Sequence, residues 1–157
     1  MSDRALRAAV AALALVGLGI AAYLTYTRYS GATIVCATGG CETVQKSSYA
    51  TVAGIPVAVL GLVAYGFILL TALGTSEPVR VAGATAALIG VLFAAWLLYA
   101  QLALIHAICQ WCVASDVVVA LLAVFTVLRV RARAPSGDVG ELLGREHHAR
   151  QGRRERP

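Results

Sequence analysis

The sequence contains little charge, which restricts the class of protein it can encode. Asp, Glu, Lys and Arg make up 13% of its 157 residues, and lysine occurs once. Soluble domains average about 25% charged residues. Hydrophobic residues make up 59% of the chain. The composition therefore excludes a typical soluble domain and indicates a membrane protein with several spans.

The basic residues are absent from most of the chain and gather near its ends. The net charge of +5 could suggest nucleic-acid binding, but a nucleic-acid partner is not expected from this placement. Basic residues that flank spans are typical of the cytoplasmic side of a membrane. Two basic residues, Arg4 and Arg7, lie at the start of the first apolar run. Eight lie at or beyond the end of the last run: Arg129, Arg131, Arg133, Arg145, Arg150, Arg153, Arg154 and Arg156.

Four apolar segments are long enough to cross a bilayer, which needs about 20 residues per helix. Residues 81–128 would extend about 72 Å as one helix, so a turn is expected over 102–108, although that stretch has neither Gly nor Pro. The first run is too long for the apolar part of a signal peptide and is predicted to be an uncleaved helix. The predicted helices cover about 5–26, 55–73, 80–101 and 109–128, with Pro56 in the first turn of the second.

The predicted fold class is therefore an all-α integral membrane protein, a four-transmembrane-helix bundle within a domain of residues 1–133. Residues 134–157 are polar, and a disordered cytoplasmic tail is expected there. With both termini in the cytoplasm, the inner segments carry eleven basic residues and the outer loop, 28–54, carries two. The positive-inside rule favours this orientation. It places the outer loop and the 102–112 corner in the same, oxidising compartment.

Cysteine is also scarce, and its four positions form two close pairs. Cys109 and Cys112 form a C-x-x-C at the predicted start of the fourth helix, where the helix dipole favours a thiolate. Cys36 and Cys41 lie in the outer loop, separated by a flexible segment, and Cys41 precedes a predicted short surface helix over 42–48. Three interpretations stay open: two fixed disulfides in a non-catalytic protein, a zinc site made of all four cysteines, and a thiol–disulfide relay.

Several motifs together resemble the bacterial vitamin K epoxide reductase family over about residues 8–130. They are Cys36-Ala-Thr-Gly-Gly-Cys41-Glu-Thr-Val-Gln, Ser47-Ser48-Tyr49-Ala50, Gly54-Ile55-Pro56-Val57 with Gly61, and Cys109-Gln-Trp-Cys112. The resemblance implies four helices around a quinone of the menaquinone or ubiquinone type. It further implies an enzyme of the bacterial cytoplasmic membrane.

The resemblance also implies roles for the cysteines. Cys36 and Cys41 would shuttle electrons from a separate thioredoxin-like, DsbA-like partner, and Cys109 and Cys112 would pass them to the membrane quinone pool, which supports disulfide formation in exported proteins. In the expected order, the partner attacks Cys36, Cys41 attacks Cys109, and Cys112 faces the quinone. The residues expected near the quinone are Val57, Gly61, Tyr65, Trp111 and Asp116. Asp116 departs from the family pattern, since some relatives carry Tyr there.

Overall fold

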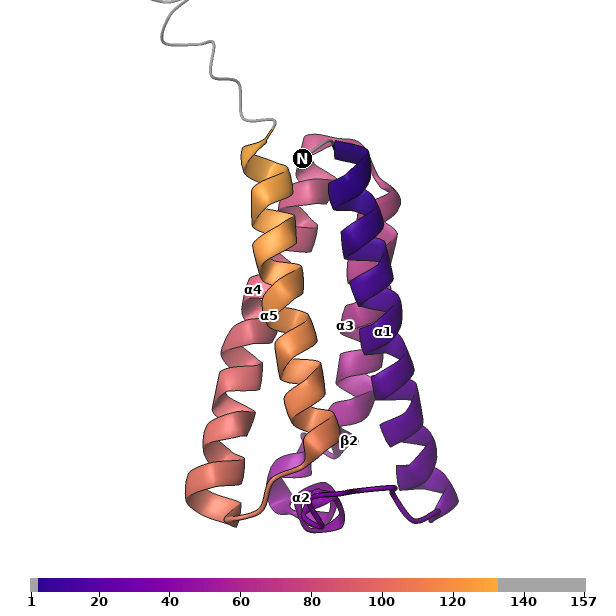
Figure 1. The fold of residues 1–157 in the computed structure, drawn as a ribbon, viewed down its shortest axis with the longest axis vertical. Helices are drawn as coiled ribbons and strands as arrows, with labels where there is room; N and C mark the ends of the chain where they lie inside the picture. Colours follow the sequence, from indigo (N-terminus) through magenta and orange to yellow (C-terminus); the bar gives the residue numbers. More distant parts are fainter. Residues whose placement is uncertain (1–2, 133–157) are drawn as a thin grey trace, which may run out of the picture.

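The computed structural model describes residues 3–132, and most of them form four long helices that lie side by side (Figure 1). These are α1 (Asp3–Ser30), α3 (Val57–Leu73), α4 (Glu77–Tyr99) and α5 (Gln110–Arg131). The start of α1 and the end of α5 lie at one end of the bundle, here called the terminal end. The opposite end, here called the cysteine end, carries the loop between α1 and α3 and the corner between α4 and α5. The predicted tail, 134–157, lies outside the described residues.

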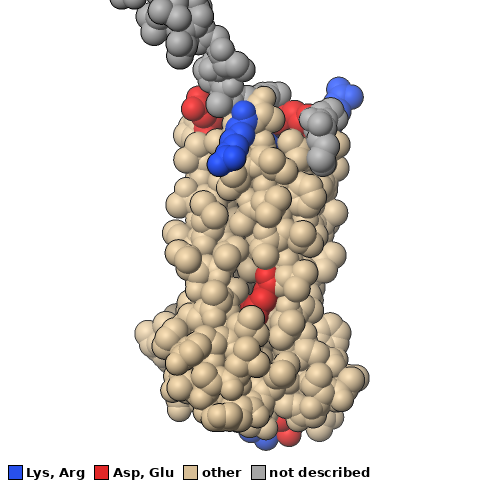
Figure 2. Space-filling view, turned by 60° about the vertical axis from the view of Figure 1, so that its left-hand side comes forward, with Lys and Arg blue, Asp and Glu red and all other residues tan. Residues whose placement is uncertain are grey.

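Within residues 3–132, three helical segments are long and apolar enough to cross a membrane. They are α1, α5, and α4 together with its continuation to Ile105, while α3 is a shorter apolar helix of 17 residues. Charged side chains gather at the two ends of the molecule, and the belt between them is almost free of charge (Figure 2). The chain is therefore a helical protein with the surface of a membrane protein.

The loop at the cysteine end contains more regular structure than the single predicted helix. It holds the short helix α2 (Cys41–Lys46), a 3₁₀ turn η1 (Ser48–Ala50), and an antiparallel pair of two-residue strands, β1 (Thr51–Val52) and β2 (Ile55–Pro56). Ala53 and Gly54 join these strands, and both have positive φ, as a tight two-residue hairpin requires. Pro56 is consequently the N-cap of α3, so its predicted place inside the first helical turn was wrong.

The corner between α4 and α5 is shorter than the predicted turn over 102–108. The α4 helix continues into a π-helical segment, η2 (Ala100–Ile105). It ends where His106 adopts a left-handed conformation with φ of 54°, and the Ala107 N–H donates to the Gln101 carbonyl at 3.1 Å. His106 thus supplies the reversal for which glycine is the usual residue.

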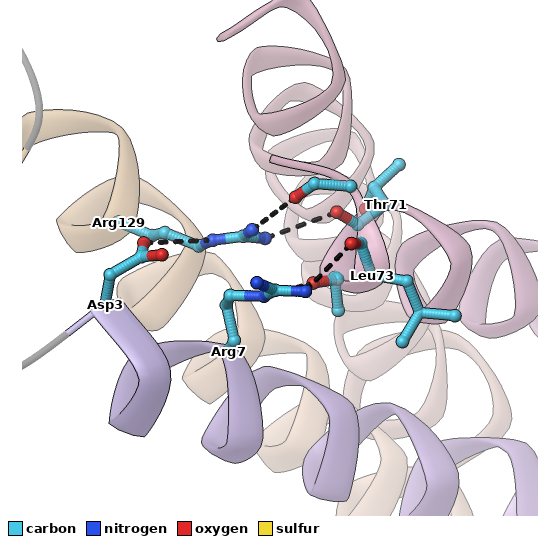
Figure 3. Close-up of polar contacts among 7 residues, drawn as sticks. Asp3, Arg7, Thr71, Leu73 and Arg129 are labelled. Atoms are coloured by element: carbon cyan, nitrogen blue, oxygen red, sulfur yellow. Dashed lines mark hydrogen bonds and ion pairs between the residues drawn. The ribbon is translucent and has the colours of Figure 1, made fainter. Parts of the chain in front are cut away.

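Arginine side chains from α1 and α5 cap the end of α3 at the terminal end (Figure 3). The last carbonyls of a helix have no partner within it and carry partial negative charge. Arg7 donates to the carbonyls of Ala72 and Leu73, at 3.2 and 2.9 Å. Arg129 donates to those of Thr71 and Gly74, at 3.2 and 2.6 Å, and pairs with Asp3 at 3.7 Å. These contacts fasten α1, α3 and α5 together at one end.

Small residues allow the helices to approach closely at two levels of the bundle. Gly17 of α1 leaves room for the ring of Tyr65, which is buried, and Gly83 of α4 leaves room for Thr71 of α3. Close approach at glycine is a common way for helices to associate in membranes. The position of Tyr65 matters for the site, because its hydroxyl reaches across to α5.

Candidate active site

Cys109 and Cys112 form a closely spaced dithiol at the start of α5. Cys109 is the N-cap of this helix, and its sulfur accepts a hydrogen bond from the Cys112 backbone N–H at 3.3 Å. The Cys112 thiol donates to the Cys109 sulfur, with the two Sγ atoms 2.7 Å apart. Both cysteines are free thiols, and this separation lets a disulfide form between them with little movement.

The surroundings of Cys109 favour its thiolate. The hydrogen bond from the Cys112 thiol is the main cause that lowers the pKa of Cys109, and backbone N–H groups of Cys112 and Trp111 act in the same direction. Burial opposes this shift without reversing it. The thiolate is the reactive form of cysteine, so Cys109 is suited to exchange.

The other two cysteines are joined in a disulfide whose ends face different surroundings. Cys36 and Cys41 are bonded, with their Cα atoms 6.0 Å apart. Cys36 is partly exposed, and its sulfur lies 3.2 Å from the Thr38 hydroxyl oxygen. Cys41 begins α2 and is fully buried. Because this bond removes two of the four thiolates, the structure differs from the interpretation of a zinc site made of all four cysteines.

The two residues between Cys109 and Cys112 hold the loop that carries Cys36. The Gln110 side-chain oxygen accepts from the Ala37 N–H at 2.9 Å. The Trp111 indole N–H donates to the Val35 carbonyl at 2.8 Å. One cysteine motif therefore contacts the backbone on both sides of Cys36.

A third contact brings the loop against the corner before α5. The Thr38 hydroxyl donates to the Ile108 carbonyl at 2.9 Å, and the absence of a side chain at Gly40 lets its backbone lie against that of Ile108. As a result Cys41 and Cys109, both with 0% exposure, belong to one buried cluster. The two cysteine pairs, far apart in sequence, meet at this point.

A mainly apolar cavity of about 310 Å³ lies beneath the cysteines, between the four long helices. Cys112 lines it and Cys109 does not. Its lining also includes four of the residues predicted near a quinone, namely Val57, Gly61, Tyr65 and Asp116. The Cys112 thiol thus lies between a buried partner sulfur and a space that can hold an apolar molecule.

Comparison with known proteins adds to this geometry. The model of the vitamin K epoxide reductase family matches residues 8–127. The chain belongs to this family. The match spans both cysteine pairs and every residue that lines the cavity, so the family assignment predicted from the motifs is confirmed.

A shorter similarity links this family member to a plant protein. Over 49 residues, the chain is 45% identical to the thiol-disulfide oxidoreductase LTO1 of Arabidopsis thaliana. The aligned segment covers 30% of this chain and 13% of the relative.

One residue predicted near the quinone lies elsewhere in this vitamin K epoxide reductase family member. Trp111 does not line the cavity. Its ring packs on that of Tyr23, with centroids 5.0 Å apart, and its N–H bonds the loop. The residue before Cys112 points to another side of α5, so a contact between Trp111 and a quinone stays a prediction.

Two polar residues of the site were not among the predicted site residues. The buried Gln101 accepts from the Cys109 N–H at 2.8 Å and so fixes the start of α5. The Ser115 hydroxyl lies 2.8 Å from the Tyr65 hydroxyl and lines the cavity. Gln101 was visible as a polar residue within an apolar run, whereas Ser115 gave no signal of its own in the sequence.

Proposed function

We propose that the chain is a membrane thiol–disulfide oxidoreductase that moves electrons from an outer protein dithiol to a membrane quinone. Electrons would pass from the partner to the Cys36–Cys41 pair, then to Cys109 and Cys112, and then to the quinone. The observation that carries this proposal is the position of the second pair. Cys109 packs in one buried cluster with Cys41, while Cys112 lines the cavity.

The first step would take place at the exposed end of the loop disulfide. A thioredoxin-like partner of the DsbA type would attack Cys36, which is the more exposed of the two residues. Breaking the Cys36–Cys41 bond releases a thiolate on Cys41 next to Cys109. Attack by Cys41 on a Cys109–Cys112 disulfide then regenerates the dithiol through ordinary mixed-disulfide exchange.

The electron acceptor would be a quinone of the menaquinone or ubiquinone type, acting as a substrate. The cavity fits such a molecule because its wall is largely apolar, and Ser115 and Asp116 line it within about one helical turn of Cys112. When bound, a quinone accepts two electrons and two protons. The Tyr65 and Ser115 hydroxyls would orient its ring, and the apolar side chains would exclude water.

The membrane arrangement belongs to the same proposal. We place four spans with both termini in the cytoplasm of a bacterium, the bundle in its cytoplasmic membrane, and the cysteine end outside. The distribution of basic residues supports this orientation. At 1.5 Å per residue α3 is about 26 Å long, slightly less than a typical hydrocarbon core of about 30 Å. The strand β2 precedes its start, and Arg129 binds the Gly74 carbonyl just after its end.

A quinone-reduction assay driven by a reduced DsbA-like protein tests the function. The purified wild-type protein is expected to reduce menadione, and Cys112→Ala is expected to abolish that activity. Val117→Ala provides a control on the same helix, since Val117 is 55% exposed on the outer surface of α5. Full activity of Cys112→Ala, together with thiol counts unaffected by the reduced partner, would favour fixed structural disulfides instead.

A further inference from the structure

The acidic side chain of Asp116 lies within the uncharged belt, and no salt bridge among the described residues neutralises it. Asp116 is one helical turn after Cys112 and lines the same cavity. Its Oδ2 atom is buried and has no hydrogen-bond partner. Figure 2 shows an acidic side chain in a hollow of the belt that is otherwise free of charge on this face.

No basic side chain in the described part of the chain is placed to neutralise Asp116. Both ion pairs found there use other acids, Asp3 with Arg129 and Glu42 with Lys46. The nearest basic residue on α5 is Arg129, 13 positions or about 20 Å further along the helix. The other helices that form the cavity carry their basic residues at the ends, and α3 carries none.

This environment favours the neutral carboxylic acid over the carboxylate. Burying an unpaired charge in apolar surroundings is costly, and a group in such a place gives up its charge. Ionisable residues inside membrane spans are rare and commonly mark proton pathways. A protonated carboxyl group beside the Cys112 thiol is both a hydrogen-bond donor and a store for one proton.

We propose that Asp116 delivers a proton to the quinone oxygen nearest Cys112 during quinone reduction. This inference rests on the proposed function and adds a catalytic residue to it. As the Cys109–Cys112 bond forms, the two sulfurs release two electrons and two protons in total. Asp116 gives its proton to the acceptor and regains one from the Cys112 thiol. The second proton is taken up by the acceptor from the outer aqueous phase, which receives the proton released by Cys109.

Infrared difference spectroscopy tests the starting state of Asp116 in the wild-type protein, independently of activity. A carboxylic acid C=O band is expected in the reduced protein. It should be missing from Asp116→Asn and should shift when menadione is added. If the wild-type protein shows no such band, or if the band is unchanged by menadione, Asp116 is not the proton donor.

Single-turnover oxidation of the reduced pair by menadione tests the step itself. General acid catalysis contributes about 10²–10⁴-fold, so Asp116→Asn is expected to slow this oxidation at least about a hundredfold. Asparagine has nearly the same shape, so menadione binding should change less than about threefold. Exchange between Cys41 and Cys109, which involves no quinone, should keep its wild-type rate.

The outcomes separate this inference from the proposed function. If Asp116→Asn oxidises the pair within threefold of the wild-type rate, the proton-delivery role is wrong and the electron route stands. If the wild-type protein transfers no electrons to any quinone, the proposed function itself fails. Slower exchange between Cys41 and Cys109 in Asp116→Asn would instead assign a structural role to the residue.

Discussion

Cys41 and Cys109 pack in one buried cluster although 68 positions separate them in the sequence. Neither side chain is exposed. Three contacts of the loop with the corner and the start of α5 produce this arrangement, through Thr38, Gln110 and Trp111. The closeness of these two residues is therefore a property of the fold itself.

Replacing Cys112 should trap a disulfide between the two pairs. In Cys112→Ser, the thiol that would displace Cys41 from Cys109 is missing, so a Cys41–Cys109 bond should accumulate under oxidising conditions. Peptide mapping without reductant detects it, and Ser115→Ala, which keeps all four thiols, is the control. A closed Cys36–Cys41 bond with Cys109 free would contradict the proposed electron route.

The two loop cysteines should differ in their reaction with the partner. Cys36 is a partly exposed residue and Cys41 is buried. In Cys41→Ser, a mixed disulfide between Cys36 and a DsbA-like protein should persist, because the resolving thiol is absent. In Cys36→Ser, at least tenfold less of this adduct is expected on non-reducing gels. Equal amounts from the two variants would show that exposure does not select the attacked sulfur.

The reactivity of Cys109 should depend on its neighbour in a definite direction. Because the Cys112 thiol is the main cause of the lowered pKa of Cys109, Cys112→Ala should move that pKa upward. The rate of alkylation by iodoacetamide rises with pH as the thiolate forms, so its midpoint should move to higher pH in the variant. The measurement uses protein that lacks Cys36 and Cys41, so that only Cys109 or the second pair reacts. An unchanged midpoint would assign the shift to the helix N-terminus alone.

Two glycines in α1 provide a matched test of the cavity wall. A methyl group at position 17 would collide with the Tyr65 ring, whereas at position 19 nothing lies within 4 Å. Gly17→Ala is expected to cost about 1–3 kcal/mol of unfolding free energy through overpacking and to slow quinone reduction by displacing the Tyr65 hydroxyl from Ser115. Gly19→Ala should be neutral or stabilising by up to about 1 kcal/mol. Thermal unfolding in detergent and the quinone assay measure both, and equal effects would exclude the packing argument.

The long helices were predictable because their apolar runs are long and nearly free of charge. Their ends were less predictable. The first helix was expected over 5–26 but runs over Asp3–Ser30, since a polar stretch such as Thr27 to Ser30 can continue a helix beyond the apolar run. The second was expected from 55, yet Ile55 and Pro56 pair with β1 instead. The third was expected to end near 101, but a π-helical segment extends it to Ile105.

The chemistry of the cysteines could be inferred from their spacing, but their environment could not. Spacing placed Cys109 at the start of a helix, and it is the N-cap there. It could not show that Trp111 bonds the loop instead of facing the cavity, because that depends on the rotation of α5 about its axis. Nor could spacing show the hydrogen bond between Ser115 and Tyr65, which joins α5 to α3 although the two residues are 50 positions apart in sequence.

The arginine caps at the terminal end bear on how a substrate gets in. They tie α3 to α1 and α5, and Thr71 packs on Gly83 of α4 at the same level. Over their whole length α3 packs more sparsely on α4 than on α1, and both helices line the cavity. The bundle is thus fastened at its terminal end, while the contact between α3 and α4 is looser than that between α3 and α1. If the substrate is the proposed quinone, the contact between α3 and α4 is the place where it would enter the cavity directly from the lipid.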